Sequence, residues 1–191
     1  DSVDATLTVT VTDVEEADPT QVQFTGVFGG AVVDGTTYTH PAGAEAWAGF
    51  ANENADLYPF SFPNGGTVTF TAAAAVDTNI NFKFERLPFP DVDPSFSTAN
   101  VTISGAEEKT YTVEFDAQGE NTFRSLIMYI VERDIAVVIK DVVVAQKAAT
   151  PAGSLMDMSG TFGAVGYNAE TNGYNFLSTA EVWGGWAHAA E

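Results

Sequence analysis

Short segments in which apolar and polar side chains alternate run through most of the chain, and this period of two most constrains the fold. Val, Ile, Phe or Tyr alternate with Thr, Asn, Lys or Glu in the segments 7–12, 67–71, 80–84, 101–104 and 110–115. Because successive side chains of a strand point to opposite faces, this pattern is typical of strands with one buried face. Turn-forming Gly, Pro, Asn and Asp cluster between these segments, at 64–66, 87–95, 104–105 and 118–119. The sequence therefore predicts an all-β fold, an antiparallel β-sandwich.

Two stretches of sequence occur twice, in the same order. GVFG at 26–29 returns as GTFG at 160–163, and AEAWAGFA at 44–51 returns as AEVWGGWA at 180–187. Ordered recurrence of this kind is the signature of a repeated structural unit.

The repeat predicts the domain organisation. Tyr38 aligns with Tyr174 and Asp34 with Glu170, if a two-residue length difference is placed just downstream of Phe28. We expect residues 19–147 to form one complete β-sandwich module. Residues 148–191 are then a linker and the truncated start of a second copy.

The first 18 residues have a different pattern, a strand-like run that ends in VTVTDVEEADPT. This segment resembles the last strand and exit linker of a cadherin-like or immunoglobulin-like domain. The resemblance implies calcium bound by the acidic linker, and a solvated acidic linker is the alternative.

The charge of the chain excludes several classes of partner. Acidic residues number 26 and basic residues 7, which gives a net charge of -19. This charge repels nucleic acid and anionic bilayers, and no apolar run is long enough to insert into a membrane, so we expect neither partner. It suits a salt-rich exterior, where repulsion is screened, and favours a secreted or extracellular protein. Cysteine is absent and only His40 and His188 are present, which disfavours thiolate chemistry and histidine metal clusters.

The first candidate ligand-binding pair is Glu45 and Trp47. If 44–51 is a strand, these two side chains share one face and the alanines face the interior. An aromatic ring can stack on a sugar while a carboxylate accepts its hydroxyls. The repeat retains both as Glu181 and Trp183. A core tryptophan beside a loop-capping or calcium-binding glutamate is the alternative.

Polar side chains on neighbouring segments extend the candidate site. In the predicted strand 79–86 they alternate with Ile, Phe and Phe, whereas in the predicted strand 123–131 an aromatic ring alternates with Leu, Met and Ile. The candidate ligand-binding residues from these segments and from the polar cluster that follows 44–51 are Asn81, Lys83, Glu85, Tyr129 and Asn52. An ordinary solvated sheet face, a packing tyrosine and a structural turn remain the alternatives.

The order of motifs in the middle of the chain resembles a known family. YPFSFPNGGTVTFTA, NINFKFE, FSTANVTISG, KTYTVEF and IAVVIKDVVV follow one another as in carbohydrate-binding modules of families four, nine and twenty-two. The resemblance spans roughly 22–145 and implies a jelly roll of a secreted marine bacterial polysaccharide-degrading protein. It also implies a structural calcium, because Asp141 matches the family's closing aspartate, which commonly helps to hold this ion. Asp34 is a second candidate metal ligand. The family's Phe-Glu near the first strand is absent, because Gly29 follows Phe28.

Three functions are compared. The favoured function is non-catalytic binding of a neutral polysaccharide such as a β-glucan or galactan. The alternative is an extracellular structural or adhesive repeat protein, or filament subunit, whose sandwich domains are stiffened by calcium and whose terminal strands are completed by neighbouring chains. An enzyme is disfavoured, because the sequence has no nucleophile motif, although the parent protein could carry a separate catalytic domain.

Overall fold

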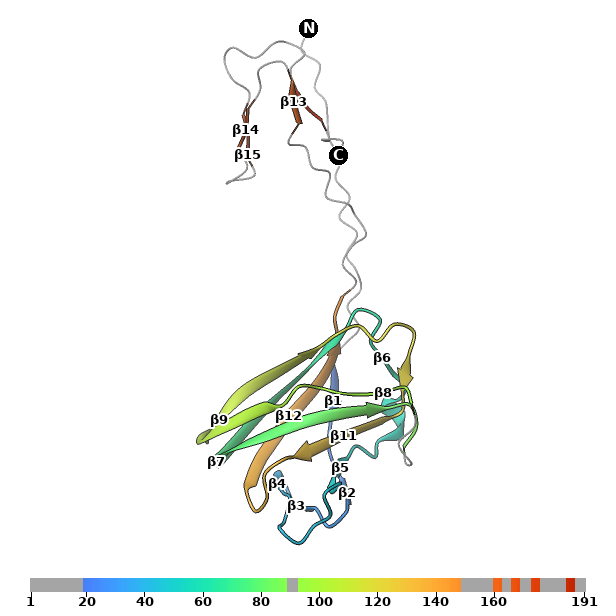
Figure 1. Ribbon diagram of the computed structural model, residues 1–191, viewed down its shortest axis with the longest axis vertical. Helices are drawn as coiled ribbons and strands as arrows, with labels where there is room; N and C mark the ends of the chain where they lie inside the picture. Colours follow the sequence, from blue (N-terminus) through green and yellow to red (C-terminus); the bar gives the residue numbers. More distant parts are fainter. Residues whose placement is uncertain are drawn as a thin grey trace. The chain divides into compact units, whose positions relative to one another are not determined.

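The computed structural model describes residues 19–88 and 93–148, together with the backbone of the strands at 160–162, 166–168, 173–175 and 185–187. The chain divides into two units, Asp1–Thr150 and Pro151–Glu191 (Figure 1). The strand and linker expected at 1–18 lie outside the described residues, and the expected module boundaries remain predictions. No helix in the described part of the chain is long and apolar enough to cross a membrane.

The first unit combines three long strands with several short ones. The long strands are β7 (Gly66–Glu85), β9 (Val101–Phe115) and β12 (Ala136–Gln146). The short strands are β1 (Thr20–Val22), β2 (Gly26–Phe28), β3 (Val32–Asp34), β4 (Thr37–Thr39), β5 (Gly49–Ala51), β6 (Phe60–Ser61), β8 (Ser95–Ser97), β10 (Thr122–Phe123) and β11 (Ser125–Ile130). A 3-10 turn, η1 (Ala55–Leu57), follows β5.

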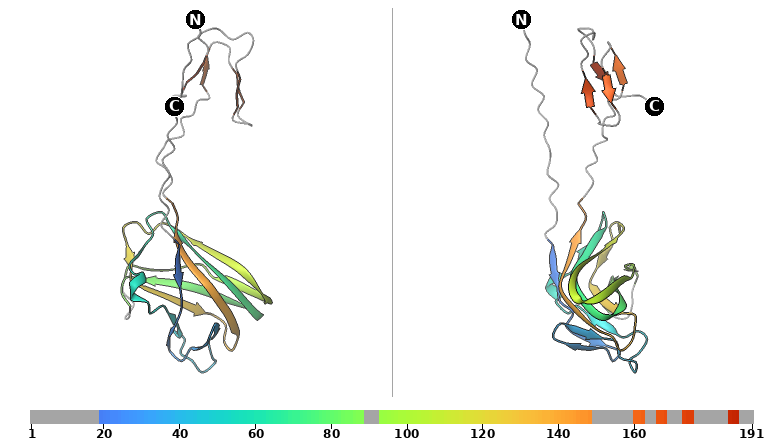
Figure 2. Two further views of the ribbon diagram at one scale, coloured as in Figure 1. Left: turned by 180° about the vertical axis from the view of Figure 1, so that it is seen from behind. Right: turned by 90° about the vertical axis from the view of Figure 1, so that its left-hand side faces the viewer.

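β7 and β9 pass from one layer of a sandwich to the other (Figures 1 and 2). Residues 66–74 of β7 pair with β12 and with the second half of β9. Residues 78–85 pair with β11, β8 and the start of β9. Phe70 and Phe82, one from each half of β7, contact each other at 5.4 Å between ring centroids. The two halves therefore face each other across a common core.

The first layer contains β9, β7 and β12, with β1 and the β3–β4 hairpin on the far edge of β12. The second layer runs β8–β7–β11–β5–β2. All pairs of named strands in the described residues are antiparallel. The predicted fold class, an all-β antiparallel β-sandwich (jelly roll), is confirmed.

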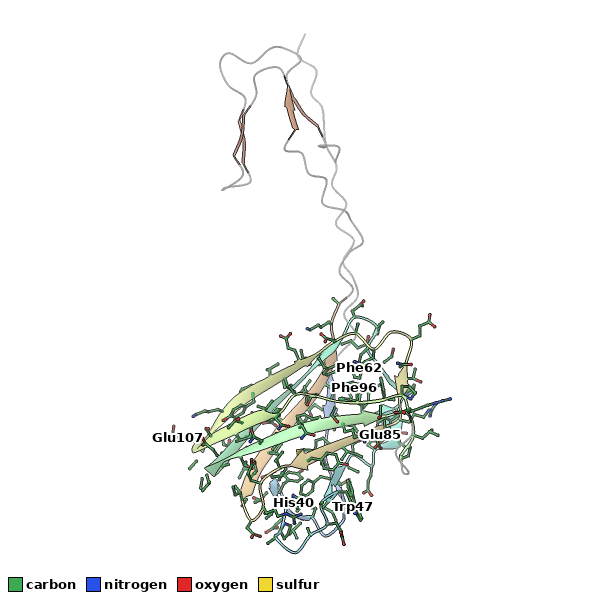
Figure 3. All side chains as sticks on the ribbon, viewed as in Figure 1. His40, Trp47, Phe62, Glu85, Phe96 and Glu107 are labelled. Atoms are coloured by element: carbon green, nitrogen blue, oxygen red, sulfur yellow. The ribbon has the colours of Figure 1, made fainter. Side chains whose placement is uncertain are left out.

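The core between the layers is rich in phenylalanine. Ile80, Phe82 and Phe84 are 0% exposed, as their alternation with polar residues predicts. The Phe84 ring lies 5.1 Å from that of Phe62 and 5.0 Å from that of Phe96, between ring centroids. Phe62 and Phe96 are labelled in Figure 3. Burying one such side chain stabilises the fold by roughly 2 kcal/mol, so this cluster fixes the second half of β7 firmly.

The strand expected over 44–51 is wrong for its first five residues. Only Gly49–Ala51 form β5, whereas 44–48 belong to a loop whose turn is closed by the bond from Ala48 N to Glu45 O at 3.0 Å. Phe50 and Ala48 are buried as expected, but Ala46 is exposed. A Cβ at Gly29 would lie 2.7 Å from the Ala48 Cα, so this loop packs tightly on a glycine turn. Such a long-range contact leaves no trace in the local alternation.

β12 changes phase in its middle. Val137 and Ile139 are buried before the change, and Val142 and Val144 after it. The register with β7 shifts between Lys140 and Val143, and Asp141 has a φ of 54°. A β-bulge inserts one extra residue and so restores the buried face, and aspartate is one of the residues that tolerate this left-handed conformation.

The second unit contains two pairs of strands. β13 (Gly160–Phe162) pairs with β16 (Gly185–Ala187), with Gly160 opposite Ala187. In the first unit β2 pairs with β5, with Gly26 opposite Ala51. The backbone pairing therefore has the same register at the two copies of the recurring sequence.

The second hairpin refines the alignment of the two copies. β14 (Gly166–Asn168) pairs with β15 (Gly173–Asn175), with Asn168 opposite Gly173, as Asp34 lies opposite Thr37 in the first unit. These registers align Asp34 with Asn168 rather than with Glu170. The length difference consequently lies between the two strands of the hairpin and not just downstream of Phe28. Glu181 and Trp183 lie outside the described residues.

Candidate functional site

The outer face of the second layer carries a cleft of about 530 Å³. Alternate residues of adjacent strands form its floor, because β11 and β7 pair with Ser125 opposite Glu85 and Ile127 opposite Lys83. Ala51 of β5 lies opposite Ile127 on the other side of β11. The remaining lining residues are Phe28, Trp47, Pro88 and Tyr129.

Three aromatic rings form the apolar part of the cleft. Trp47 is 60% exposed, although large apolar side chains usually avoid water. Its ring is nearly parallel to that of Phe28, at 8° with 6.2 Å between centroids. Tyr129 meets Phe28 edge to face, at 85° and 6.2 Å. Phe28 thus supports both other rings.

The polar part of the cleft comes from β7 and β11. The Glu85 residue is 4% exposed, and its carboxylate accepts a hydrogen bond from Ser125 Oγ at 3.1 Å. Lys83 Nζ lies 3.5 Å from Glu85 Oε1. A partly buried carboxylate and ammonium held in fixed positions can accept from and donate to ligand hydroxyls.

Rings beside such groups are suited to amphipathic ligands. The C–H face of a sugar packs on an aromatic ring, while its hydroxyls need hydrogen-bonding partners at the edge. The lining of the cleft offers both surfaces on one sheet face. Trp47 and Glu85, which both belong to the lining, are labelled in Figure 3.

The structure brings together four of the residues singled out in the sequence. Trp47, Lys83, Glu85 and Tyr129 line the cleft. Asn81 lies opposite Tyr129 in the register of β7 and β11 but is not part of the lining, and its Nδ2 donates to Asn100 Oδ1 at 3.0 Å.

Glu45 and Asn52 lie away from the cleft lining. Glu45 is exposed at the turn before Trp47. Asn52 is 8% exposed, and its Nδ2 donates to Gln23 O at 2.7 Å. It lines a smaller cleft of about 340 Å³ among polar side chains of other elements. A third cleft, of about 550 Å³, lies along β12 near Asp141.

Sequence analysis did not identify Phe28, Ala51 or Pro88 as site residues. Ser125 and Ile127 share the alternating face of Tyr129, so the period of β11 was a usable signal for them. For Phe28 the only signal was its place in the recurring GVFG stretch, because its partners Trp47 and Tyr129 are distant in the sequence.

The calcium implied by the family resemblance is not tested and stays a prediction. Calcium takes six to eight oxygen ligands, commonly with several carboxylates. In the described part of the chain, no three His, Cys, Asp or Glu side chains gather as metal ligands would. Asp34 and Asp141 are both exposed, and Asp141 occupies the bulge of β12. The described residues therefore do not fit a site built from several carboxylates.

No family model matches the chain, and no curated protein matches it. Among solved structures it is similar to CBM29_1, a family 29 carbohydrate-binding module from Piromyces equi, with 14% identity and a TM-score of 0.44 over 69% of this chain and 92% of that one. It is also similar to the CBM22-1 xylan-binding domain of Xyn10C from Paenibacillus barcinonensis, with 13% identity and a TM-score of 0.43 over 69% of this chain and 87% of that one. A mutant CBM29-2 module complexed with mannohexaose has 16% identity and a TM-score of 0.46 over 69% of this chain and 93% of that one.

All three of these structures are carbohydrate-binding modules, and the likeness to them concerns the fold.

Proposed function

We propose that the first unit binds a neutral polysaccharide without cleaving it. The observation that carries the proposal is the exposed ring of Trp47, supported by Phe28 in a cleft whose other wall is polar. A ring held in this way by a second ring is pre-organised, so little conformational entropy is lost when a sugar stacks on it.

The absence of catalysis is part of the proposal. Glycosidases generally use two carboxylates about 5 to 9.5 Å apart, one on each side of the scissile bond. Among the described residues that line the cleft, Glu85 is the only carboxylate. Its carboxylate lies 3.5 Å from Lys83 Nζ and accepts a hydrogen bond from Ser125 Oγ, an arrangement that suits a hydrogen-bond acceptor.

The charge of the chain supports a neutral ligand. A net charge of -19 disfavours the approach of an anionic polymer such as alginate. We infer a β-glucan or a galactan as the ligand and a secreted, extracellular location, where salt screens repulsion over about 10 Å.

Affinity electrophoresis tests this proposal. The chain is run in native gels that contain laminarin, agarose, xylan or alginate, and its mobility is compared with that in a gel without glycan. We expect retardation in laminarin or agarose and none in alginate. Unchanged mobility in all the neutral gels would remove the proposal, and retardation in alginate alone would reverse the assignment of ligand charge.

A second candidate function is a structural role for repeated sandwich modules. It is favoured by the shared register of β13–β16 and β2–β5, which supports a second copy in the unit 151–191. If calcium stiffens the linkers, the melting temperature of the chain should be higher in the presence of calcium than in the presence of a chelator. An equal melting temperature in both conditions, together with retardation in laminarin, would favour binding over the structural role.

A further inference from the structure

We propose that Arg133 and His40 are positioning residues that hold the loop carrying Trp47, and that His40 makes this hold depend on pH. The inference rests on the proposed function, because it concerns the orientation of the stacking ring. Nothing in the alternation of residues 40–48 indicates it, since the contacts join segments about ninety residues apart.

Arg133 fixes the start of the loop. It lies in the turn between β11 and β12, and its guanidinium Nη1 lies 3.0, 3.0 and 2.7 Å from the carbonyl oxygens of Pro41, Ala42 and Ala44, which share its two N–H donors. The next residue, Asp134, accepts a hydrogen bond from Ala42 N at 2.8 Å. Bonds to charged groups are about twice as strong as neutral ones, so this turn binds the loop backbone tightly.

His40 fixes the middle of the loop. The residue is 5% exposed, with its ring Nδ1 2.9 Å from Ile130 O and Nε2 3.1 Å from Glu45 O. Carbonyl oxygens only accept hydrogen bonds, and a neutral imidazole carries a single N–H. Only the protonated ring can therefore donate to both carbonyl oxygens at once.

The Glu45 carbonyl connects this histidine to Trp47. It also accepts from Ala48 N at 3.0 Å, and Glu45 N donates to Gly29 O at 2.8 Å. Trp47 lies within this turn, between the Glu45 carbonyl oxygen, which His40 contacts, and Ala48, which packs on Gly29. Figure 3 shows His40 and Trp47 at the same end of the first unit.

The other charged groups on the elements around His40 are Glu45 on its own loop and Glu132, Arg133 and Asp134 on the β11–β12 turn. Burial raises the pKa of Tyr38, on the adjacent strand β4, although the Phe24 carbonyl lowers it in part, so this phenol stays neutral. A comparison of the unmodified chain with His40→Gln therefore shows whether a change with pH depends on His40.

The direction of the effect follows from the count of N–H groups. When the His40 ring is protonated it donates to both Ile130 O and Glu45 O, and the turn of Trp47 is held. Loss of the proton removes one N–H and therefore one of the two bonds. A lost hydrogen bond from a charged group corresponds to about a tenfold change in loop opening.

Hydrogen exchange of the full chain, without a ligand, tests whether Arg133 and His40 stabilise the loop that carries Trp47. Protection factors of the peptide that contains residues 41–50 are measured at about pH 5.5 and about pH 8, on either side of the histidine range. We expect them to fall by about tenfold with rising pH in the unmodified chain. They should not change with pH in His40→Gln, whose amide does not titrate.

Three further variants test the contributions of Arg133 and His40 separately. Arg133→Ala should lower the protection at both pH values and retain the dependence on pH, whereas Lys109→Ala, which removes a cation that contacts Ser104 instead, should change nothing. His188→Gln removes the other histidine of the chain and should leave the profile unaltered. The role of His40 is overturned if the protection factors of the unmodified chain do not change with pH. It is also overturned if they still change with pH in His40→Gln.

Titration with laminarin under the same conditions connects the hold to binding. We expect the affinity to fall with rising pH in parallel with the protection. Equal affinity at both pH values, with altered protection, would overturn the positioning role. Altered protection with no binding of laminarin, agarose or xylan at either pH would support the hold and reject the proposed function.

Discussion

Gly49 of β5 lies beneath the rings that support the cleft. A Cβ at this residue would be 2.8 Å from Tyr129 Cε1 and 2.9 Å from Phe28 Cζ. The rings can meet edge to face only because residue 49 has no side chain. Gly43, in the preceding loop, has no other group within 4 Å of such a Cβ.

Gly49→Ala therefore tests the arrangement of the rings. We expect it to displace Phe28 and Tyr129, to lower the free energy of unfolding by about 1 to 3 kcal/mol and to weaken laminarin binding several-fold. Gly43→Ala is the matched control and should change the free energy of unfolding by less than about 0.5 kcal/mol. Urea denaturation and affinity electrophoresis measure the two effects, and equal behaviour of the variants would contradict the packing described.

At the residue scale, alternation predicted which side chains share a face and not which neighbours they meet. Lys83, Glu85 and Tyr129 belong to regular strands, so their common face followed from the period of two. Trp47 was expected on the outer face of a strand, but it lies in a loop, where its side chain is exposed. Its position depends on Gly29 and Phe28, and the sequence contains no local sign of either contact.

At the element scale, the bulge in β12 shows how one residue restores a buried face. The spacing of Ile139 and Val142 breaks the alternation by one residue, which was a readable signal for the bulge. The bulge also gives Asp141 a structural role that does not involve a metal. Similarly, alternation identified both halves of β7, but their continuity through the bend depends on packing between the layers.

Asp141→Gly and Asp141→Ala separate these roles. Glycine adopts a φ of 54° without strain, whereas alanine pays a steric cost there, so we expect the glycine variant to be more stable than the alanine variant by about 1 kcal/mol. Urea denaturation measures the difference, in the presence of a chelator and in the presence of calcium. If both variants are destabilised equally, and only in calcium, Asp141 acts as a metal ligand instead.

The turn between β11 and β12 is tied to β7 by a carboxylate. Glu132 accepts hydrogen bonds from Thr78 Oγ1 at 2.8 Å and from Asn79 Nδ2 at 2.9 Å, as well as from the Asn79 backbone. Desolvation raises the pKa of Glu132, but these hydrogen bonds together outweigh it, and the net pKa is lowered.

A lowered pKa makes this contribution sensitive to acid. It is fully present above the pKa of glutamate in the unfolded chain and is lost as the pH falls through the lower pKa of the folded state. We expect Glu132→Gln to lower the free energy of unfolding by about 1 kcal/mol at neutral pH and by less in acid. Urea denaturation between neutral pH and about pH 3 checks this, and a constant difference across the series would contradict it.

At the scale of the whole molecule, the described core is self-contained. All the buried apolar side chains of the described residues belong to the segment from Val22 to Val144, within the first unit. We expect a fragment of residues 19–148 to unfold in one cooperative transition and to bind a short glucan as well as the full chain does. Weaker retention on the polymer alone would indicate that the second unit also binds. A fragment that fails to fold would show that residues outside it complete the core.

The most direct test of the central claim is the affinity of Trp47→Ala for a neutral glycan, measured by calorimetry with laminarin or with whichever neutral polymer retards the chain most. Because Trp47 is 60% exposed, the variant should keep its melting temperature, and loss of the stacking ring should weaken binding by about tenfold or more. Val76→Ala removes another apolar side chain that is 60% exposed, outside the cleft, and should bind as the unmodified chain does. An unchanged affinity in a folded Trp47→Ala would contradict the account.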